Sequence, residues 1–152
     1  MPCQGSVLVV DDELGPRESL RMILHPLYEV FTAENGAEAL AYIEEKQFDL
    51  MTLDLKMPGI SGMDVLREIR TKKVDLDVII VSGYWTPKNA QEATGYGVCD
   101  VITKPFNVTD IVAKVGKCVE QKKFSRQAKD LIEEGKKLGV IQGDESNQNR
   151  LN

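Results

Sequence analysis

The sequence predicts an α/β fold, a doubly wound five-stranded parallel sheet with helices on both faces. Short runs of aliphatic and β-branched residues alternate with segments whose apolar residues follow helical spacing. Five such pairs follow one another along the chain, and this alternation is typical of a parallel sheet covered by helices. Four of the apolar runs end in an acidic residue, a serine or a lysine. Open parallel sheets bind ligands at the carboxyl ends of their strands, so these polar residues are expected to share one site.

Each predicted element has its own pattern. The strands are the apolar runs at residues 7–10, 28–33, 49–53, 78–81 and 98–103. Helical spacing covers residues 16–24, 36–45, a segment after Ser61 that runs through residue 69, 87–96 and 109–119. Pro16 suits the first turn of a helix and Ser61 suits an N-cap, so these residues mark where two of the helices begin.

Three carboxylates are the strongest chemical signal. Asp11 and Asp12 follow the first run and Asp54 follows the third, so a parallel sheet brings them into one pocket. Carboxylates this close repel one another, so either one stays protonated or a cation lies among them. An oxygen-only site that retains water suits Mg²⁺, with Asp12 and Asp54 as direct ligands and Asp11 as a second or water-mediated one. The backbone carbonyl of Lys56 is expected to face the same ion.

Asp54 is the predicted nucleophile. One of its oxygens attacks a phosphorus atom in line and forms an aspartyl phosphate. Because the transferred group carries spread negative charge, catalysis consists mainly of positioning and charge stabilisation. Lys104 supplies a positive charge to one phosphoryl oxygen, and Ser82 supplies a hydroxyl to another. Pro105 stiffens the loop after Lys104 and is a candidate for a cis peptide bond.

Four motifs in this order resemble the receiver domain of bacterial two-component response regulators. They are Val-Asp-Asp-Glu at 10–13, Asp-Leu-Lys-Met-Pro-Gly-Ile-Ser-Gly at 54–62, Val-Ser-Gly at 81–83 and Lys-Pro-Phe at 104–106. The resemblance covers about residues 5–121. It implies a flavodoxin-like fold in which Asp11 and Asp12 hold Mg²⁺ and Asp54 accepts a phosphoryl group. It also implies that Ser82 and Lys104 contact that group.

The resemblance implies the partners as well. The donor is a histidine kinase or a histidine phosphotransfer protein, and the output is a downstream protein or an output domain missing from this chain. The face built by the fourth helix, fifth strand and fifth helix is expected to rearrange. Such a protein is no conventional enzyme, because it catalyses only its own phosphorylation and dephosphorylation. The loop around Ser82 and the extended C-terminal segment resemble receivers that precede an ATPase and a DNA-binding domain.

Two positions stand out against the family pattern. The family has an aromatic switch residue three positions before the lysine, where this chain has Val101. A β-branched side chain has little freedom to swing, so Tyr84 or Trp85 is a candidate to replace the aromatic coupling. Tyr84 also lies where the family tunes loss of the phosphoryl group. Its ring is expected to hinder the attacking water.

Composition sets the broad class. The chain has 152 residues, of which 42% are hydrophobic and 28% charged, as in a globular protein with one domain and a short appendage. A net charge of -5 argues against direct nucleic-acid binding. The lack of a membrane-spanning apolar run and of a signal-peptide pattern predicts a cytoplasmic protein. Cys3, Cys99 and Cys118 lack metal-site spacing and are predicted to be structural thiols in a reducing compartment.

Residues 5–121 are predicted to form the receiver, and residues 122–152 a C-terminal helical extension or linker with a tail. The extension has a short amphipathic pattern at Phe124, Ala128, Leu131, Ile132 and Leu138. The residues after Gly143 are polar and predicted to be disordered. The amphipathic segment packs on its own domain, extends as a frayed helix or forms a homodimer.

Two other functions remain open. A phosphorylation-independent adaptor would keep the fold and use its surface constitutively; Val101 favours it, and the intact acidic pocket opposes it. A metal-dependent phosphohydrolase commonly needs a second carboxylate two residues after the nucleophile as acid and base. This chain has Lys56 at that position.

Overall fold

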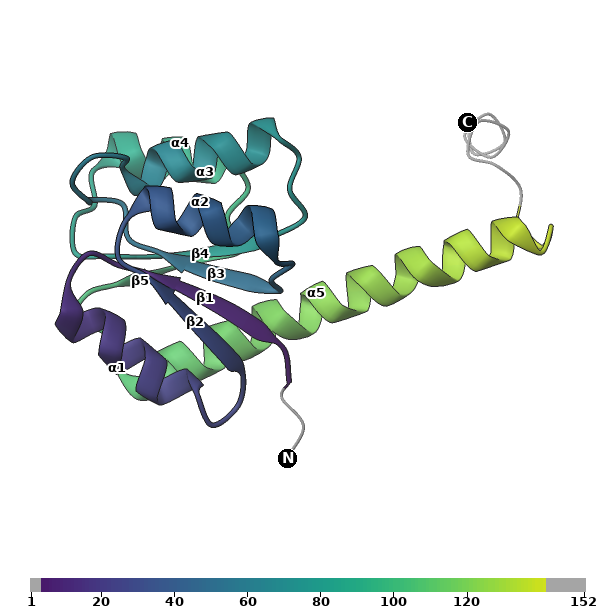
Figure 1. Cartoon of the computed structure of the whole chain (residues 1–152), viewed down its shortest axis with the longest axis horizontal. Coiled ribbons are helices and arrows are strands. Elements are labelled where there is room, and N and C mark those ends of the chain that lie inside the picture. The colour runs from purple at the N-terminus through teal and green to yellow at the C-terminus, as the bar shows by residue number, and fades with distance from the viewer. Residues whose placement is uncertain (1–3, 142–152) are drawn as a thin grey trace. The chain divides into compact units, whose positions relative to one another are not determined.

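The computed structural model describes residues 4–141, in which ten regular elements alternate along the chain (Figure 1). The strands are β1 (Ser6–Val10), β2 (Glu29–Ala33), β3 (Leu50–Leu53), β4 (Asp77–Ser82) and β5 (Asp100–Thr103). The helices are α1 (Leu14–Leu24), α2 (Gly36–Glu45), α3 (Gly62–Thr71), α4 (Pro87–Gly95) and α5 (Val108–Lys137). Every predicted strand and helix is confirmed, with ends within two residues of the prediction except for the end of α5.

The five strands form one parallel sheet in the order β2-β1-β3-β4-β5. The chain order reverses between β1 and β3, which is where ligands of such sheets bind. The register pairs Val10 with Leu53, so β1 and β3 end level with each other. The N–H of Asp54 donates to the carbonyl of Val10 (3.1 Å), which continues the ladder to the first residue of the site.

Helices cover both faces of the sheet (Figure 1), and each face has its own buried apolar cluster. One cluster, beneath α2, α3 and α4, includes Leu8 and Met51. The other, beneath α1 and the first turns of α5, includes Val9 and Leu50. Neighbouring residues of one strand belong to opposite clusters because successive side chains point to opposite faces. The central strands therefore read as continuous apolar runs rather than alternating ones.

The last helix is longer than predicted. α5 continues to Lys137, 18 residues beyond the predicted end at residue 119, because no proline or glycine interrupts residues 117–134. The helix closes where Gly139 adopts a φ of 74° and the N–H of Val140 donates to the carbonyl of Gly135 (2.9 Å).

The chain divides into two compact units, Met1–Val119 and Glu120–Asn152, and α5 contributes to both. Within the second unit the apolar side chains of the predicted amphipathic pattern are largely exposed, as at Phe124, Leu131 and Leu138. The residues predicted to be disordered after Gly143 lie outside the described part of the chain. None of the helices in residues 4–141 combines the length and apolar character that a membrane span requires.

The prediction of free structural thiols is wrong for two of the three cysteines. Cys99, directly before β5, and Cys118, on α5, form a disulfide with their Cα atoms 6.4 Å apart. The sequence spacing of 19 residues gave no sign that this position of α5 faces the start of β5. Cys3 lies outside the described residues.

Gly62, the first residue of α3, packs directly against the end of β3. A Cβ atom at this position would overlap the backbone carbonyl of Asp54, which cannot move aside as a flexible side chain would. Gly62→Ala is therefore expected to lower the free energy of unfolding by at least about 2 kcal/mol, measured by urea denaturation.

Gly15→Ala is the matched control. Gly15 lies in α1, and no atom lies within 4 Å of the place that an added Cβ would take, so alanine is expected to be neutral or to add about 0.5–1 kcal/mol. Equal stability of the two variants would contradict the close approach of α3 to Asp54.

Candidate functional site

An open pocket of about 590 Å³ lies at the carboxyl ends of the strands. It is lined by Asp12, Glu13, Asp54, Lys56, Met57, Pro58, Ser82, Gly83, Tyr84 and Lys104. Five of the six predicted site residues are in this lining, and the sixth, Asp11, is bonded to Lys104 beneath it. The structure thus brings together every residue that the sequence indicated for the site.

Four carboxylates converge on this pocket. Asp11, Asp12, Glu13 and Asp54 each offer one oxygen, and these oxygens all lie within 4.8 Å of one another. Asp11 and Asp54 are buried, at 1% and 4% exposure, whereas Asp12 and Glu13 are more open to solvent. All four donors are oxygens, and two of them are accessible to water. Such a set fits a hard divalent cation that keeps part of its hydration shell, as Mg²⁺ does.

Glu13 was not among the predicted site residues. Its carboxylate belongs to the acidic cluster, and its Oε1 lies 3.7 Å from Nζ of Lys104. The signal for it was present, because it is the third acid of the Asp-Asp-Glu run that closes β1.

Lys104 reaches across the pocket from the end of β5. Its Nζ lies 2.7 Å from Oδ2 of Asp11 and 3.2 Å from Oδ2 of Asp54, and its side chain is only 14% exposed. The backbone N–H of Lys104 donates to the carbonyl of Ser82 (3.0 Å), which fixes the end of β5 to the end of β4. The Lys104–Pro105 bond is cis. One ammonium group therefore contacts the residues that follow two different strands.

Burial and charge shift the pKa values of this pair. Burial raises the pKa of Asp54 above its ordinary value; the charge of Lys104 opposes this rise, and the charge of Asp11 adds to it. Burial alone would lower the pKa of Lys104, but its hydrogen bond to Asp11 and the charges of Asp11 and Asp54 outweigh burial and raise it. Lys104 is thus held as a cation. The ionised form of Asp54 is destabilised by burial, so a further cation beside it would be stabilising.

Backbone contacts hold the two buried carboxylates in place. Oδ1 of Asp11 accepts the N–H of Glu13 (2.9 Å), and the carbonyl of Asp11 accepts a bond from the Arg17 guanidinium (2.9 Å). Oδ1 of Asp54 accepts the N–H of Lys56 (3.4 Å). Arg17 gave no signal in the sequence, because its role depends on how α1 lies against the end of β1. The role of the Lys56 carbonyl toward a metal stays a prediction.

Ser82, Tyr84 and Lys56 form the remaining wall of the pocket. Ser82 is fully buried, and its Oγ accepts the N–H of Tyr84 (3.1 Å). The Tyr84 ring is 53% exposed, and Nζ of Lys56 lies 4.8 Å from its centroid. Trp85 and Val101 both pack against the apolar cluster beneath α2, α3 and α4. The Trp85 Nε1–H is buried with no hydrogen-bond partner among the described residues.

The raised pKa of Asp54 predicts the effect of removing its charge. The folded state binds the carboxyl proton of Asp54 more tightly than the unfolded state does. Below the ordinary pKa of aspartate the group is protonated in both states, so it does not lower the free energy of unfolding. As the pH rises through the raised pKa, ionisation of Asp54 lowers the free energy of unfolding. Asp54→Asn is expected to increase the free energy of unfolding at pH 7 in EDTA, and the gain should vanish near pH 3. Urea denaturation at a series of pH values measures it.

Asp64→Asn supplies the comparison. Hydrogen bonds with Ser61 lower the pKa of Asp64, so this variant should gain no stability at pH 7. A loss of stability in Asp54→Asn at neutral pH would show that the ion pair with Lys104 outweighs burial.

Comparisons of the sequence with known proteins agree on one family. Residues 7–116 match the family model described as the response regulator receiver domain. The transcriptional regulatory protein ResD of Bacillus subtilis is 41% identical over 113 residues, which cover 74% of this chain and 47% of ResD. The cell cycle response regulator CtrA of Brucella ovis is 29% identical over 80% of this chain and 53% of CtrA. The chain thus spans about half the length of these curated relatives.

Solved structures give the same result. A CheY-like receiver domain protein from Methanospirillum hungatei superposes with a TM-score of 0.75 at 29% identity, over 79% of this chain and 97% of that one. NtrX from Brucella abortus superposes with a TM-score of 0.76 at 31% identity, over 84% of this chain and 30% of NtrX. Since the family match covers most of the sequence and the fold and pocket agree with it, the chain belongs to the response regulator receiver domains.

Proposed function

We propose that this receiver accepts a phosphoryl group on Asp54 from a phosphohistidine donor, with Mg²⁺ held by the acidic cluster. The observation that carries the proposal is the pairing of a buried carboxylate, open to a pocket, with the Lys104 ammonium 3.2 Å away. An Asp54 oxygen forms the bond to phosphorus as the bond from phosphorus to the donor imidazole breaks, and the imidazole nitrogen takes a proton. Water later attacks the phosphorus, releases inorganic phosphate and restores the carboxylate.

The acidic cluster is suited to the ion. Asp12 and Asp54 would bind Mg²⁺ directly, with Asp11 as a second or water-mediated ligand and the Lys56 carbonyl as a further one. When bound, the ion supplies positive charge that stabilises the phosphoryl oxygens. Lys104, held as a cation by Asp11, supplies the same kind of stabilisation.

Ser82 is the proposed link between phosphorylation and the surface. Its Oγ now accepts the N–H of Tyr84, and a hydroxyl that turns to donate to a phosphoryl oxygen must give up part of this contact. Two residues after Tyr84, Thr86 caps α4, because its Oγ1 accepts the N–H of Asn89 (3.1 Å). A shift at Ser82 would therefore reach the start of α4 through Tyr84 and Trp85, which take the place of the aromatic missing at Val101. Phosphorylation would bias a pre-existing equilibrium between two arrangements.

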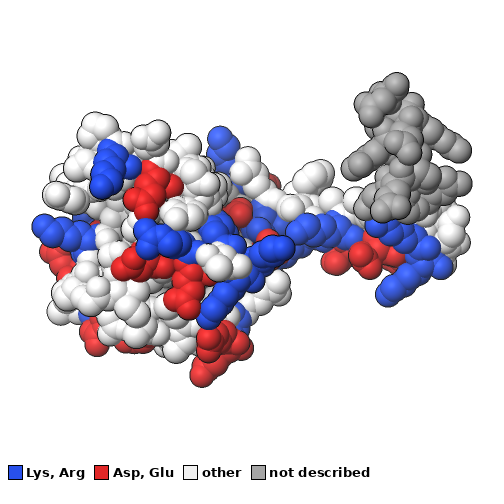
Figure 2. Space-filling model, turned by 90° about the horizontal axis from the view of Figure 1, so that it is seen from above, with Lys and Arg blue, Asp and Glu red and all other residues white. Residues whose placement is uncertain are grey.

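The setting of this switch is part of the proposal. A histidine kinase or histidine phosphotransfer protein would be the donor, and a downstream protein or an output domain beyond this chain would be the target, in the cytoplasm. Residues 5–121 would act as the receiver and 122–152 as the extension, with a homodimer through its amphipathic face as one arrangement. On the face of the receiver seen in Figure 2, acidic and basic side chains are interspersed, while basic side chains predominate along the part of α5 that follows it. The phosphorylation-independent adaptor is not favoured by the comparisons.

Peptide-level mass spectrometry after incubation with acetyl phosphate and Mg²⁺ tests the proposal. One phosphoryl group is expected on the peptide that holds Asp54, and EDTA or Asp54→Asn should abolish it. Lys104→Met should slow its formation by about 100-fold, because one stabilising cation is lost. Asp64→Asn, which lies outside the pocket, should behave as wild type. A phosphoryl group that forms equally well on Asp54→Asn protein would reject Asp54 as the acceptor.

Tyr84 is expected to lengthen the life of the acyl phosphate. Its half-exposed ring lies at the pocket wall beside Lys56 and obstructs the approach of water. Tyr84→Ala should speed autodephosphorylation several-fold, as followed by release of inorganic phosphate from the purified phosphoprotein. Tyr84→Phe keeps the ring and should stay near the wild-type rate. No acceleration in Tyr84→Ala would count against a shielding role.

A further inference from the structure

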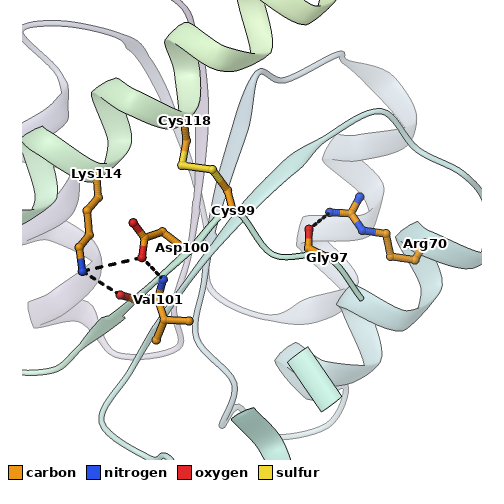
Figure 3. Close-up of a disulfide and its surroundings, with 7 residues drawn as sticks. All are labelled: Arg70, Gly97, Cys99, Asp100, Val101, Lys114 and Cys118. Atoms are coloured by element: carbon orange, nitrogen blue, oxygen red, sulfur yellow. Dashed lines mark hydrogen bonds and ion pairs between the residues drawn. A yellow bond between two sulfur atoms is a disulfide. The ribbon is translucent and has the colours of Figure 1, made fainter. Parts of the chain in front are cut away.

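The disulfide joins the edge strand of the sheet to the helix packed against it (Figure 3). β5 is hydrogen-bonded to β4 on one side only. The N–H of Cys99 donates to the carbonyl of Val78 (2.8 Å), which fixes Cys99 at the start of this edge. Cys118 lies three helical turns into α5 and is 1% exposed within the apolar cluster of that face. The bond between them therefore sets how far β5 and α5 can move apart.

The closed segment contains part of the site. Residues 99–118 include β5, the first turns of α5 and, between them, Lys104. Lys104 follows Cys99 by five residues, which places it roughly 16 Å away along an extended strand. The disulfide is thus at the end of β5 opposite the pocket. It touches none of the site residues, yet it constrains the segment that carries the site cation.

A second tether holds the same two elements without a covalent bond. Nζ of Lys114, on α5, lies 3.1 Å from the carbonyl of Val101 and 3.8 Å from Oδ1 of Asp100 (Figure 3). Ile102 of β5 also packs in one buried cluster with Ile111 and Val115 of α5. These contacts do not involve the sulfur atoms, so the reduced receiver is expected to stay folded even where the segment gains freedom.

The domain does not depend on the disulfide for a core. Apolar clusters are buried on both faces of the sheet, whereas structural disulfides are typical of small secreted domains that cannot build such a core. In proteins of reducing compartments, disulfides are more often transient and redox-sensing. Cys99 is the more exposed residue of the pair, since it is partly buried and Cys118 is buried. A reductant can therefore approach from the side of Cys99.

We propose that the Cys99–Cys118 disulfide is a redox-responsive clamp that restrains the β5–α5 segment and so limits phosphorylation of this receiver. The inference rests on the proposed function of Asp54 and Lys104. When Asp54 carries a phosphoryl group, Lys104 must turn from Asp11 and Asp54 toward a phosphoryl oxygen, and the segment that carries Lys104 must adjust. A covalent link between β5 and α5 restricts that adjustment, and its reduction releases the segment.

The reductant is a dithiol. One of its sulfurs, as the thiolate, attacks the sulfur of Cys99; the sulfur–sulfur bond breaks, and the sulfur of Cys118 leaves and takes a proton. The second thiol of the reductant then loses its proton. Its thiolate attacks the first sulfur of the reductant, which is bonded to Cys99 in the mixed disulfide. The sulfur of Cys99 is displaced and takes a proton. The two electrons that reduce Cys99 and Cys118 come from the dithiol, which ends as a disulfide.

The test compares the oxidised 152-residue chain with the same protein treated with dithiothreitol. All proteins carry Cys3→Ser, so that thiol labelling reads the pair alone, with none labelled before reduction and two after it. Reduction is expected to raise the rate of acetyl-phosphate-dependent phosphorylation of Asp54 at least threefold. It should also lower the melting temperature by roughly 5–10 °C, because loop-closure entropy returns to the unfolded chain. Amide hydrogen exchange in residues 99–118 should become faster.

Cys99→Ala and Cys118→Ala supply the matched variants. Each should show the rate of the reduced protein with and without dithiothreitol, since neither can form the bond. Equal phosphorylation rates and equal exchange in oxidised and reduced protein would overturn the clamp. Absence of a phosphoryl group on Asp54 in both redox states would overturn the proposed function and the regulation with it, whereas the hydrogen exchange would report on the clamp separately.

Discussion

The ammonium group of Lys104 is the contact on which the site depends. It comes from the end of β5 and bonds to Asp11 after β1 and to Asp54 after β3, so it joins three strand ends in one salt-bridged centre. Three of the four clustered carboxylates, those of Asp11, Glu13 and Asp54, lie within 4 Å of this ammonium group. Burial, with a smaller contribution from the charge of Asp11, raises the pKa of Asp54 despite the ion pair with Lys104. The excess of carboxylates explains why the pocket suits a divalent ion. The register of β1 with β3 and the lack of a side chain at Gly62 serve to hold Asp54 at this point.

The sequence was sufficient to predict the architecture, because short apolar runs and segments of helical spacing alternate clearly along the chain. Central strands such as Val7 to Val10 and Val78 to Val81 are apolar runs, and they fit only a sheet covered on both faces. The Ser61 cap of α3 agrees with the prediction because capping chemistry is local. The site was predictable for a different reason: parallel strands place the residues that follow them at one edge, so Asp11, Asp54, Ser82 and Lys104 had to meet.

The contacts that the sequence did not indicate depend on how separate helices, strands and loops face one another. The Cys99–Cys118 bond needs one particular face of α5 against the start of β5, and a spacing of 19 residues does not specify that face. Arg17 contacts the Asp11 carbonyl only because α1 turns back across the end of β1. The contact of Lys56 with the Tyr84 ring joins two loops from different strands. The length of α5 was underestimated because exposed residues such as Lys123 and Lys129 carry no signal for a helix end.

The central claim is that one charged centre at the strand ends receives a phosphoryl group and transmits its arrival through the ends of β4 and β5. Backbone amide NMR of the protein before and after addition of beryllofluoride with Mg²⁺ tests this claim most directly, because the complex imitates an acyl phosphate. The largest shifts are expected at residues 11–13, 54–56, 82–86 and 103–105, and smaller ones along α4 and β5. Unchanged amide signals in these four segments, or shifts confined to other parts of the molecule, would contradict the account.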